Sequence, residues 1–285
     1  MCSRLERDVL SLRDPAETVE RIIRFLRTHT DRIGAKCLVL GMSGGLDSSV
    51  CAVLCSMAVS GRKTLGFSLT ESQTLNPANF RDAQEVAKKH SIRFKSLDIT
   101  GVFDETIGLV HTPRRLPNIA LGNIKARIRA LILYYYANVN DGLVVGTGDK
   151  SEIMTGYFTK YGDGACDILP IGDLYKTTVR DLARYLKLPS RIYSKPSTPE
   201  LWPGQTAEKE LGLSYEKLDQ VLWAFERWVP AKEISKELGI PPKRVESVRQ
   251  RWLSTEHKRR PPLTMKLGYR TSGQDLRIPY SLPKD

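Results

Sequence analysis

One run of nine residues, Gly41 to Ser49, constrains this chain more than any other part of its sequence. The run is GMSGGLDSS, and it follows the apolar residues 37–40, which we expect to form a buried strand. Residues 50–58 come next, and their apolar pattern predicts a helix packed on a sheet. A glycine turn between a strand and a helix presents backbone N–H groups and the positive end of the helix dipole. The run therefore predicts an anion site in an α/β fold.

The side chains of this run narrow the kind of anion. Ser43 and Ser48 add hydroxyl donors, and Asp47 adds a carboxylate suited to a magnesium ion. The run lacks the lysine that a Walker A loop requires. It resembles instead the SGGxDS loop of the PP-loop ATP pyrophosphatases, which cleave ATP between its α and β phosphates. A glycine-rich turn that binds no ligand is the alternative.

The charge of the chain favours anionic ligands without choosing among them. The 285 residues carry a formal net charge of +12, and such a surface attracts nucleic acids, membranes or small polyanions. No apolar run approaches the ~20 residues that cross a bilayer, and residues 1–8 lack the apolar core of a signal peptide. We therefore expect a cytoplasmic protein without a membrane partner.

The five cysteines include no CxxC pair, which argues against a zinc site or a disulfide framework. Cys51 and Cys55 lie four residues apart within an expected helix, so both are predicted to pack in the core.

Alternating strand and helix patterns predict a doubly wound, mostly parallel sheet with helices on both faces, of Rossmann-like topology. Ligands of such sheets bind beyond the C-terminal ends of the strands, so the turn at 146–152 is expected beside the first loop. After Pro170 the pattern becomes helical. We expect a single domain over 1–285, with an α/β core at 1–200, a helical region at 201–260 and a tail at 261–285. The expected strands are 37–41, 64–69, 92–99 and 143–146, and the expected helices of the core are 15–32, 50–58, 79–90 and 119–138.

Three further segments carry basic or aromatic side chains in unusual density. They are GNIKARIR at 122–129, TGYFTKYGDG at 155–164 and EHKRRPP at 256–262. The first places Lys125 and Arg129 on one helix face and Arg127 on another. A solvated basic helix, an ordinary aromatic core and a solvated charge run are the respective alternatives for the three segments.

Taken together, these segments resemble the ammonia-dependent NAD synthetases. SGGLDSS, GNIKARIR, GTGDKSE, TGYFTKYGDG, LPIGDLYKT, WPGQTAEKELG and EHKRRPP occur in the order and at the spacing of that family, over residues 15–265. The resemblance implies an adenine nucleotide alpha hydrolase-like fold and the last step of NAD biosynthesis. ATP adenylates the nicotinate carboxylate of deamido-NAD, pyrophosphate leaves, and ammonia then displaces AMP to give NAD.

The resemblance also implies roles for individual residues. It makes Asp47 and Glu152 the magnesium ligands, and it places Asp163 near the nicotinate as a candidate catalytic residue. The ATP-binding set is Gly41, Met42, Ser43, Gly44, Gly45, Leu46, Asp47, Ser48, Thr147, Lys176 and Thr198, and the set for deamido-NAD is Arg127, Lys160, Asp167, His257 and Lys258.

The family is homodimeric, with the helix expected at 119–138 in the interface and the dinucleotide held between subunits. The chain has no room for the amidase domain of the glutamine-using branch, so free ammonia is the expected nitrogen donor, with a separate amidase subunit as the alternative source.

Two segments depart from the family pattern. Ala207 stands where the GQTDE-like stretch has an acidic residue, and Gly148-Asp149 differs from the Asp-His of some members. We therefore assign the loop at 204–208 no catalytic role.

Two other functions remain as alternatives. A PP-loop enzyme that modifies tRNA would share the loop and the basic charge, but it would need an RNA-binding module or catalytic cysteines. A DNA-binding protein could use residues 231–245, whose pattern is typical of a helix-turn-helix. The tRNA-modifying enzyme would leave TGYFTKYGDG unexplained, and a two-helix corner such as 231–245 is common in any helical region, so nucleic acid is not an expected partner.

Overall fold

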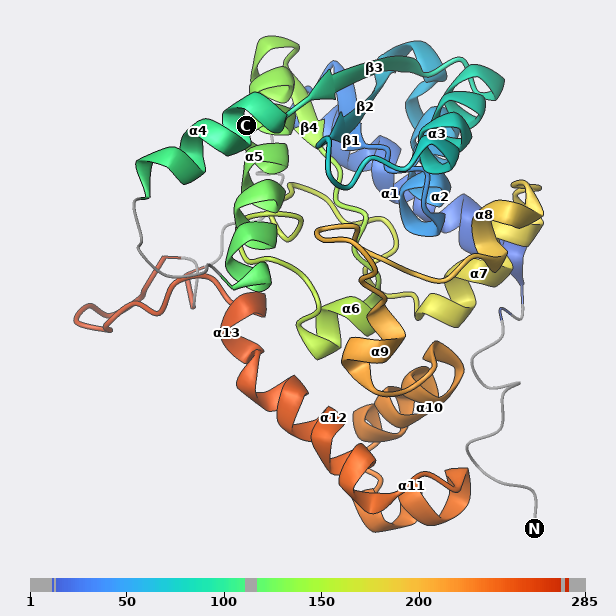
Figure 1. Ribbon diagram of the computed structural model, residues 1–285, viewed down its shortest axis with the longest axis vertical. Coiled ribbons are helices and arrows are strands. Elements are labelled where there is room, and N and C mark those ends of the chain that lie inside the picture. Colours follow the sequence, from blue (N-terminus) through green and yellow to red (C-terminus); the bar gives the residue numbers. More distant parts are fainter. Residues whose placement is uncertain (1–11, 13, 111–116, 273–274, 277–285) are drawn as a thin grey trace.

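The fold is built on a parallel sheet of four strands in the order β3-β2-β1-β4 (Figure 1). The structure, a computed structural model, describes residues 12, 14–110, 117–272 and 275–276. The expected strands are confirmed to within a few residues. Their bounds are Cys37–Gly41 for β1, Thr64–Thr70 for β2, Arg93–Asp98 for β3 and Gly142–Val144 for β4.

Helices cover both faces of the sheet, as the strand–helix alternation predicted (Figure 1). Alternate residues of β1 serve the two layers: Leu38 and Leu40 join one apolar cluster, and Cys37 and Val39 join the other. The first layer holds α1 (Pro15–Ile33), α2 (Leu46–Val59), α3 (Pro77–Lys89), α7 (Lys176–Tyr185) and α8 (Ser190–Ser194), and the second holds α4 (Thr100–Leu109) and α5 (Asn118–Val139).

Local sequence signals set the ends of the first helix. The side chain of Asp14 accepts a hydrogen bond from the Glu17 N–H, and Pro15 occupies the first turn, where its missing N–H costs nothing. Gly34 ends the helix with a φ of 73°, a conformation that glycine adopts without strain. Inside the next helix, α2, Cys51 and Cys55 are both buried and free, as predicted.

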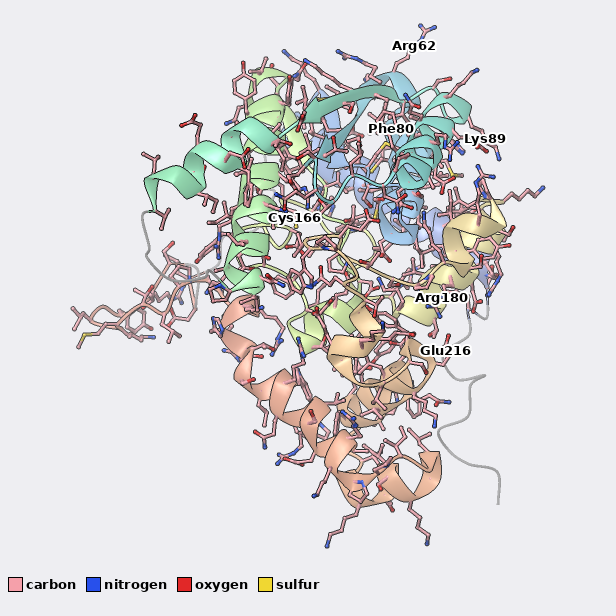
Figure 2. All side chains as sticks on the ribbon, viewed as in Figure 1. Arg62, Phe80, Lys89, Cys166, Arg180 and Glu216 are labelled. Carbon is pink, nitrogen blue, oxygen red and sulfur yellow. The ribbon has the colours of Figure 1, made fainter. Side chains whose placement is uncertain are left out.

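A second apolar core, centred on Tyr215, Leu218 and Leu222, holds the helical region together. Arg180 of α7 and Glu216 of α10 (Tyr215–Glu226) form an ion pair at 2.5 Å that joins this region to the α/β core (Figure 2). No helix in the described part of the chain is long and apolar enough to cross a membrane. The remaining helices are α6 (Lys150–Thr155), α9 (Ala207–Leu211), α10 (Tyr215–Glu226), α11 (Ala231–Leu238), α12 (Pro242–Ser254) and α13 (Glu256–Arg259).

The segment at 231–245 forms a two-helix corner from α11 and the start of α12, turning at Gly239 with a φ of 61°. Val245 and Val248 of α12 are buried in the second apolar core. This corner therefore has a structural role in the helical region, whether or not it binds anything.

Candidate active site

A cavity of about 380 Å³ lies beyond the C-terminal ends of β1, β2 and β4. Gly146, Thr147 and Glu152 line it together with the first loop, so the expected position of the turn at 146–152 is confirmed. The size is within the usual range for small-molecule sites. The residues singled out from the sequence that line it are Gly41, Met42, Ser43, Gly45, Leu46, Asp47, Ser48, Thr147, Glu152, Asp163, Thr198 and Lys258.

The glycine-rich loop has the form of an anion site. Gly44 has a φ of +77°, and a Cβ there would lie 1.9 Å from the carbonyl oxygen of Asn79, so only glycine fits. Gly45 is the N-cap of the 14-residue helix α2 and provides no side-chain cap, which leaves N–H groups of the first turn without such a partner. The hydroxyl groups of Ser43 and Ser48 lie 3.1 Å apart beside this helix end. The loop therefore offers donors and a helix dipole to a negatively charged group.

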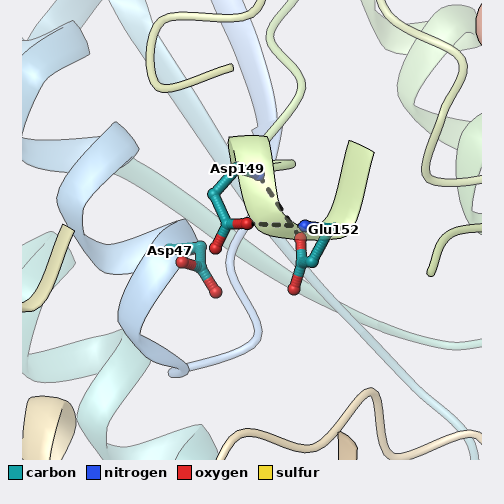
Figure 3. Close-up of side chains that lie close together, drawn as sticks. All are labelled: Asp47, Asp149 and Glu152. Atoms are coloured by element: carbon teal, nitrogen blue, oxygen red, sulfur yellow. Dashed lines mark hydrogen bonds between the residues drawn. The ribbon is translucent and has the colours of Figure 1, made fainter. Parts of the chain in front are cut away.

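Three carboxylates gather next to this loop. Oxygen atoms of Asp47, Asp149 and Glu152 lie within 4.8 Å of one another (Figure 3). Asp149 caps α6 by accepting a hydrogen bond from the Glu152 N–H at 2.9 Å, and Glu152 accepts one in return from the Asp149 N–H. This capping box fixes both side chains. Asp47 and Glu152 were predicted from the sequence and Asp149 was not, although its spacing of three residues from a glutamate is typical of a capping box.

Lys176, at the start of α7, lies behind these carboxylates with its side chain fully buried. Its Nζ is 2.7 Å from an oxygen of Asp47, 2.7 Å from one of Asp149 and 2.9 Å from one of Glu152. Burial alone would lower the pKa of Lys176, but the three carboxylates outweigh it and hold that pKa well above its ordinary value. Lys176 is therefore charged and bound to the cluster rather than part of the cavity wall. Its predicted contact with ATP stays a prediction.

The same cluster fits a magnesium ion. Three ionised carboxylates facing one ammonium leave two negative charges uncompensated. Burial raises the pKa of both Asp149 and Glu152, because it disfavours their charged forms, which a cation would stabilise. Asp47 Oδ1 is buried and has no hydrogen-bond partner among the described residues. Hard divalent cations prefer oxygen ligands of this kind, so the donor set matches Mg²⁺ in charge and chemistry.

A buried aspartate of the helical region supports the site from behind. Asp219 of α10 accepts hydrogen bonds from Ser151 Oγ at 2.5 Å and from the N–H and the hydroxyl of Thr177 at 2.9 Å each. Ser151 Oγ in turn accepts from the Lys176 N–H at 3.0 Å. Burial raises the pKa of Asp219 to about 7. Asp219 therefore joins the starts of α6 and α7. This role was not predicted from the sequence.

Four of the residues selected for the dinucleotide lie together. Arg127 of α5 donates to the carbonyl of Lys160 at 3.3 Å, and Lys160 Nζ donates to the carbonyl of His257 at 2.6 Å. Lys258 Nζ donates to the carbonyls of Gly156 and Phe158 at 2.8 Å each. The three segments noted for their basic and aromatic residues thus meet at one edge of the cavity.

Asp167 lies apart from these four. Its carboxylate accepts hydrogen bonds from the Val144 N–H at 2.8 Å and the Tyr134 hydroxyl at 3.1 Å. Tyr134 is seven residues along α5 from Arg127, which corresponds to about 10 Å of helix. Neither of these two bonds joins Asp167 to the other four residues, and its predicted contact with the dinucleotide stays a prediction.

The reading of 122–129 as a solvated basic helix is wrong for two of its three cations. Lys125 Nζ lies 2.6 Å from a Glu71 oxygen, and their side chains are 5% and 1% exposed. Arg129 donates to the Leu69 carbonyl at 3.0 Å. Only Arg127 is exposed. Glu71 precedes Lys125 by 54 residues, so no local pattern could have revealed the pair.

This chain is similar to a family of known proteins. The family model described as NAD synthase matches residues 18–262. Two curated relatives, each named NH(3)-dependent NAD(+) synthetase, are similar over nearly all of their length. The protein of Methanocaldococcus jannaschii is 44% identical over 87% of this chain and 96% of its own. That of Staphylothermus marinus is 40% identical over 90% and 93%.

Solved structures of synthetases share the fold of this chain. The structure titled NMN synthetase from Francisella tularensis matches with a TM-score of 0.78 and 30% identity, over 89% of this chain and 99% of its own. An NH3-dependent NAD synthetase from Campylobacter jejuni matches with a TM-score of 0.74 and 29% identity, over 89% and 100%. The length of the family match and the identity to the curated relatives show that this chain belongs to the NAD synthase family.

Proposed function

We propose that this protein forms NAD from deamido-NAD, ATP and ammonia, as a ligase that makes a C–N bond. The observation that carries the proposal is a single cavity shared by two sets of groups. The glycine-rich loop and two of the three carboxylates line it, and so do Lys258 and Asp163. Such a cavity can hold a polyphosphate next to a second anionic substrate.

The chemistry requires activation of a carboxylate, which is a poor electrophile. ATP supplies it: the nicotinate carboxylate attacks the α-phosphorus, the bond to the β-phosphate breaks, and pyrophosphate leaves. Ammonia then attacks the acyl carbon, and AMP leaves. Neither step needs a covalent bond to the enzyme, so the residues act by positioning and by stabilising charge.

We assign the phosphate-binding role to the N–H groups of the loop and to the hydroxyl groups of Ser43 and Ser48. Asp47 and Glu152 would hold Mg²⁺, with Asp149 beside them. The metal, when bound, neutralises charge on the phosphates. The fit of the donor set supports this assignment. Thr147 and Thr198 are assigned to ATP because both line the same cavity.

The dinucleotide side is assigned to Arg127, Lys160, His257 and Lys258, with Asp163 near the nicotinate. Three of these residues are always or usually cationic, which suits the pyrophosphate bridge of a dinucleotide. Asp163 accepts a hydrogen bond from the Thr159 N–H at 2.8 Å, which orients its carboxylate within the loop at 155–164.

We further propose that two copies of the chain form a homodimer through α5. Leu131, Tyr135 and Val139 of this helix are 68%, 61% and 63% exposed, a large apolar surface for a helix of one protomer. Asp167 accepts a hydrogen bond from Tyr134 of the same helix. A dinucleotide that spans two subunits would bring Asp167 into use.

The dimer predicts a clear effect of Leu131→Glu. A charge at this exposed position leaves the fold of the protomer intact but opposes burial against a second copy. Sedimentation velocity should show a dimer for the wild type and a monomer for the variant at the same concentration. Gln84→Glu, at an exposed position of α3 in the other helix layer, adds the same charge; it is the matched control and should remain dimeric. A monomeric wild type would contradict the proposed dimer.

We also propose that residues 1–285 act as one functional domain. Asp219 of the helical region hydrogen-bonds the starts of α6 and α7, so the α/β core and the helical region build the site together.

The substrate is tested by comparing deamido-NAD with nicotinic acid mononucleotide, because one structural relative bears the name NMN synthetase. Both acids could be adenylated at the same carboxylate. The basic group of Arg127, Lys160, His257 and Lys258 predicts a clearly higher kcat/KM for the dinucleotide. An equal or higher value for the mononucleotide would overturn the assignment of the substrate while leaving the reaction type in place.

A further inference from the structure

Lys195 binds the glycine-rich loop through the backbone of Gly44. It follows α8, and its side chain is 26% exposed. Its Nζ donates to the carbonyl oxygen of Gly44 at 2.6 Å and to the side-chain oxygen of Asn79 at 2.5 Å, and it lies 3.2 Å from a carboxylate oxygen of Asp82. Lys195 is therefore joined both to the loop and to helix α3 behind it.

These contacts use the whole donor capacity of the side chain. An ammonium group has three N–H donors, and Gly44, Asn79 and Asp82 account for all three. Although Lys195 lines the cavity, no donor remains for a phosphate while this arrangement lasts. The geometry therefore gives Lys195 no direct contact with a polyphosphate.

The contact at Gly44 fixes the orientation of one peptide group. In a planar trans peptide the carbonyl of Gly44 and the N–H of Gly45 point in opposite directions. The carbonyl faces Lys195, while the Gly45 N–H donates to Ser43 Oγ at 3.2 Å, on the side where Ser43 and Gly45 line the cavity. The reverse orientation would turn a carbonyl oxygen, which carries partial negative charge, toward an incoming polyphosphate.

Glycine makes this constraint necessary. A peptide between two glycines, Gly44 and Gly45, has wide conformational freedom, and little in their own structure selects one orientation. Asn79 packs against Gly44 from the α3 side, where a Cβ would be only 1.9 Å from its carbonyl oxygen. Lys195 adds a charged hydrogen bond to this packing, and such bonds are among the stronger ones in proteins.

We infer that Lys195 is a positioning residue of the phosphate site, which holds the Gly44–Gly45 peptide so that its N–H, bonded to Ser43 Oγ, points to the side where Ser43 and Gly45 line the cavity. The inference rests on the proposed use of ATP at this loop. It assigns Lys195 a role that acts through the backbone of the loop and not through contact with the substrate.

Calorimetry with inorganic pyrophosphate and magnesium tests this role without turnover. Lys195→Met, which keeps the length of the side chain and removes its donors, should bind pyrophosphate about ten- to a hundredfold more weakly than the wild type. The KM for ATP should rise in the same proportion, whereas the KM for deamido-NAD should not change. Lys195→Arg keeps a cation and donors and should restore a large part of the affinity.

Arg191→Gln is the matched control. Arg191 lies one helical turn earlier and also pairs with Asp82, at 2.7 Å, but it makes no contact with Gly44. This variant should bind pyrophosphate as the wild type does. If Lys195→Met does not fold, as judged by its thermal transition, Lys195→Gln replaces it with the same expected direction.

The outcomes separate the inference from the proposed function. A wild type that binds neither pyrophosphate nor ATP would contradict the use of ATP at this loop. A wild type that binds pyrophosphate, with Lys195→Met binding equally well, would overturn the role of Lys195 alone. An equal loss in Arg191→Gln would also overturn it, because the effect would then come from the pairing with α3.

Discussion

Lys176→Met should cost this protein about 3–5 kcal/mol of unfolding free energy, together with most of its activity. The ammonium of Lys176 is fully buried and touches Asp47, Asp149 and Glu152. Its removal leaves three carboxylates close together with no compensating charge. Chemical denaturation at neutral pH measures the loss, and added Mg²⁺ should recover part of it because a divalent cation can replace the missing charge.

The control for this variant is Arg184→Met on the same helix. Arg184 pairs with Asp181, but the two side chains are 55% and 36% exposed, and exposed pairs contribute at most about 1 kcal/mol. A loss in Lys176→Met no larger than that in Arg184→Met would contradict the charge balance that we assign to the cluster.

Asp47→Asn should lower kcat/KM by a hundredfold or more, with little effect on the fold. A bound metal ion stabilises the transition state of phosphate chemistry by several kcal/mol, and the variant should lose much of that stabilisation. Asparagine keeps the shape of the side chain, and Lys176 keeps its contacts with Asp149 and Glu152. The variant should also need more Mg²⁺ for half-maximal activity. Steady-state rates over a magnesium titration measure both effects.

Asp104→Asn is the control for this second variant, since Asp104 is an exposed residue of α4 outside the cavity. It should behave as the wild type does. Normal activity and normal magnesium dependence in Asp47→Asn would remove Asp47 from the metal site.

The sequence was informative where a feature depends on neighbouring residues. The helix expected at 15–32 and the strand expected at 37–41 depend on local signals such as the Asp14 cap and the apolar run, and the structure places both within one residue of those bounds. The SGGLDSS run likewise predicted its own loop and helix, because strand, turn and helix follow one another directly in the chain.

Features that join distant segments could not be predicted in this way. The Glu71–Lys125 pair, the support of Ser151 by Asp219 and the binding of Gly44 by Lys195 connect residues 54, 68 and 151 positions apart. Periodicity and spacing carry no information about such contacts. Asp149 is a different case: its capping-box spacing was present in the sequence, but the position was treated only as a departure from the family pattern.

Product analysis is the most direct test of the central claim that this cavity couples cleavage of ATP at the α-phosphorus to amide formation. The purified protein, given deamido-NAD, ATP, Mg²⁺ and ammonium, should form NAD, AMP and pyrophosphate in equal amounts, and glutamine in place of ammonium should give little product. Formation of ADP would contradict the account, because it would mean cleavage between the β and γ phosphates.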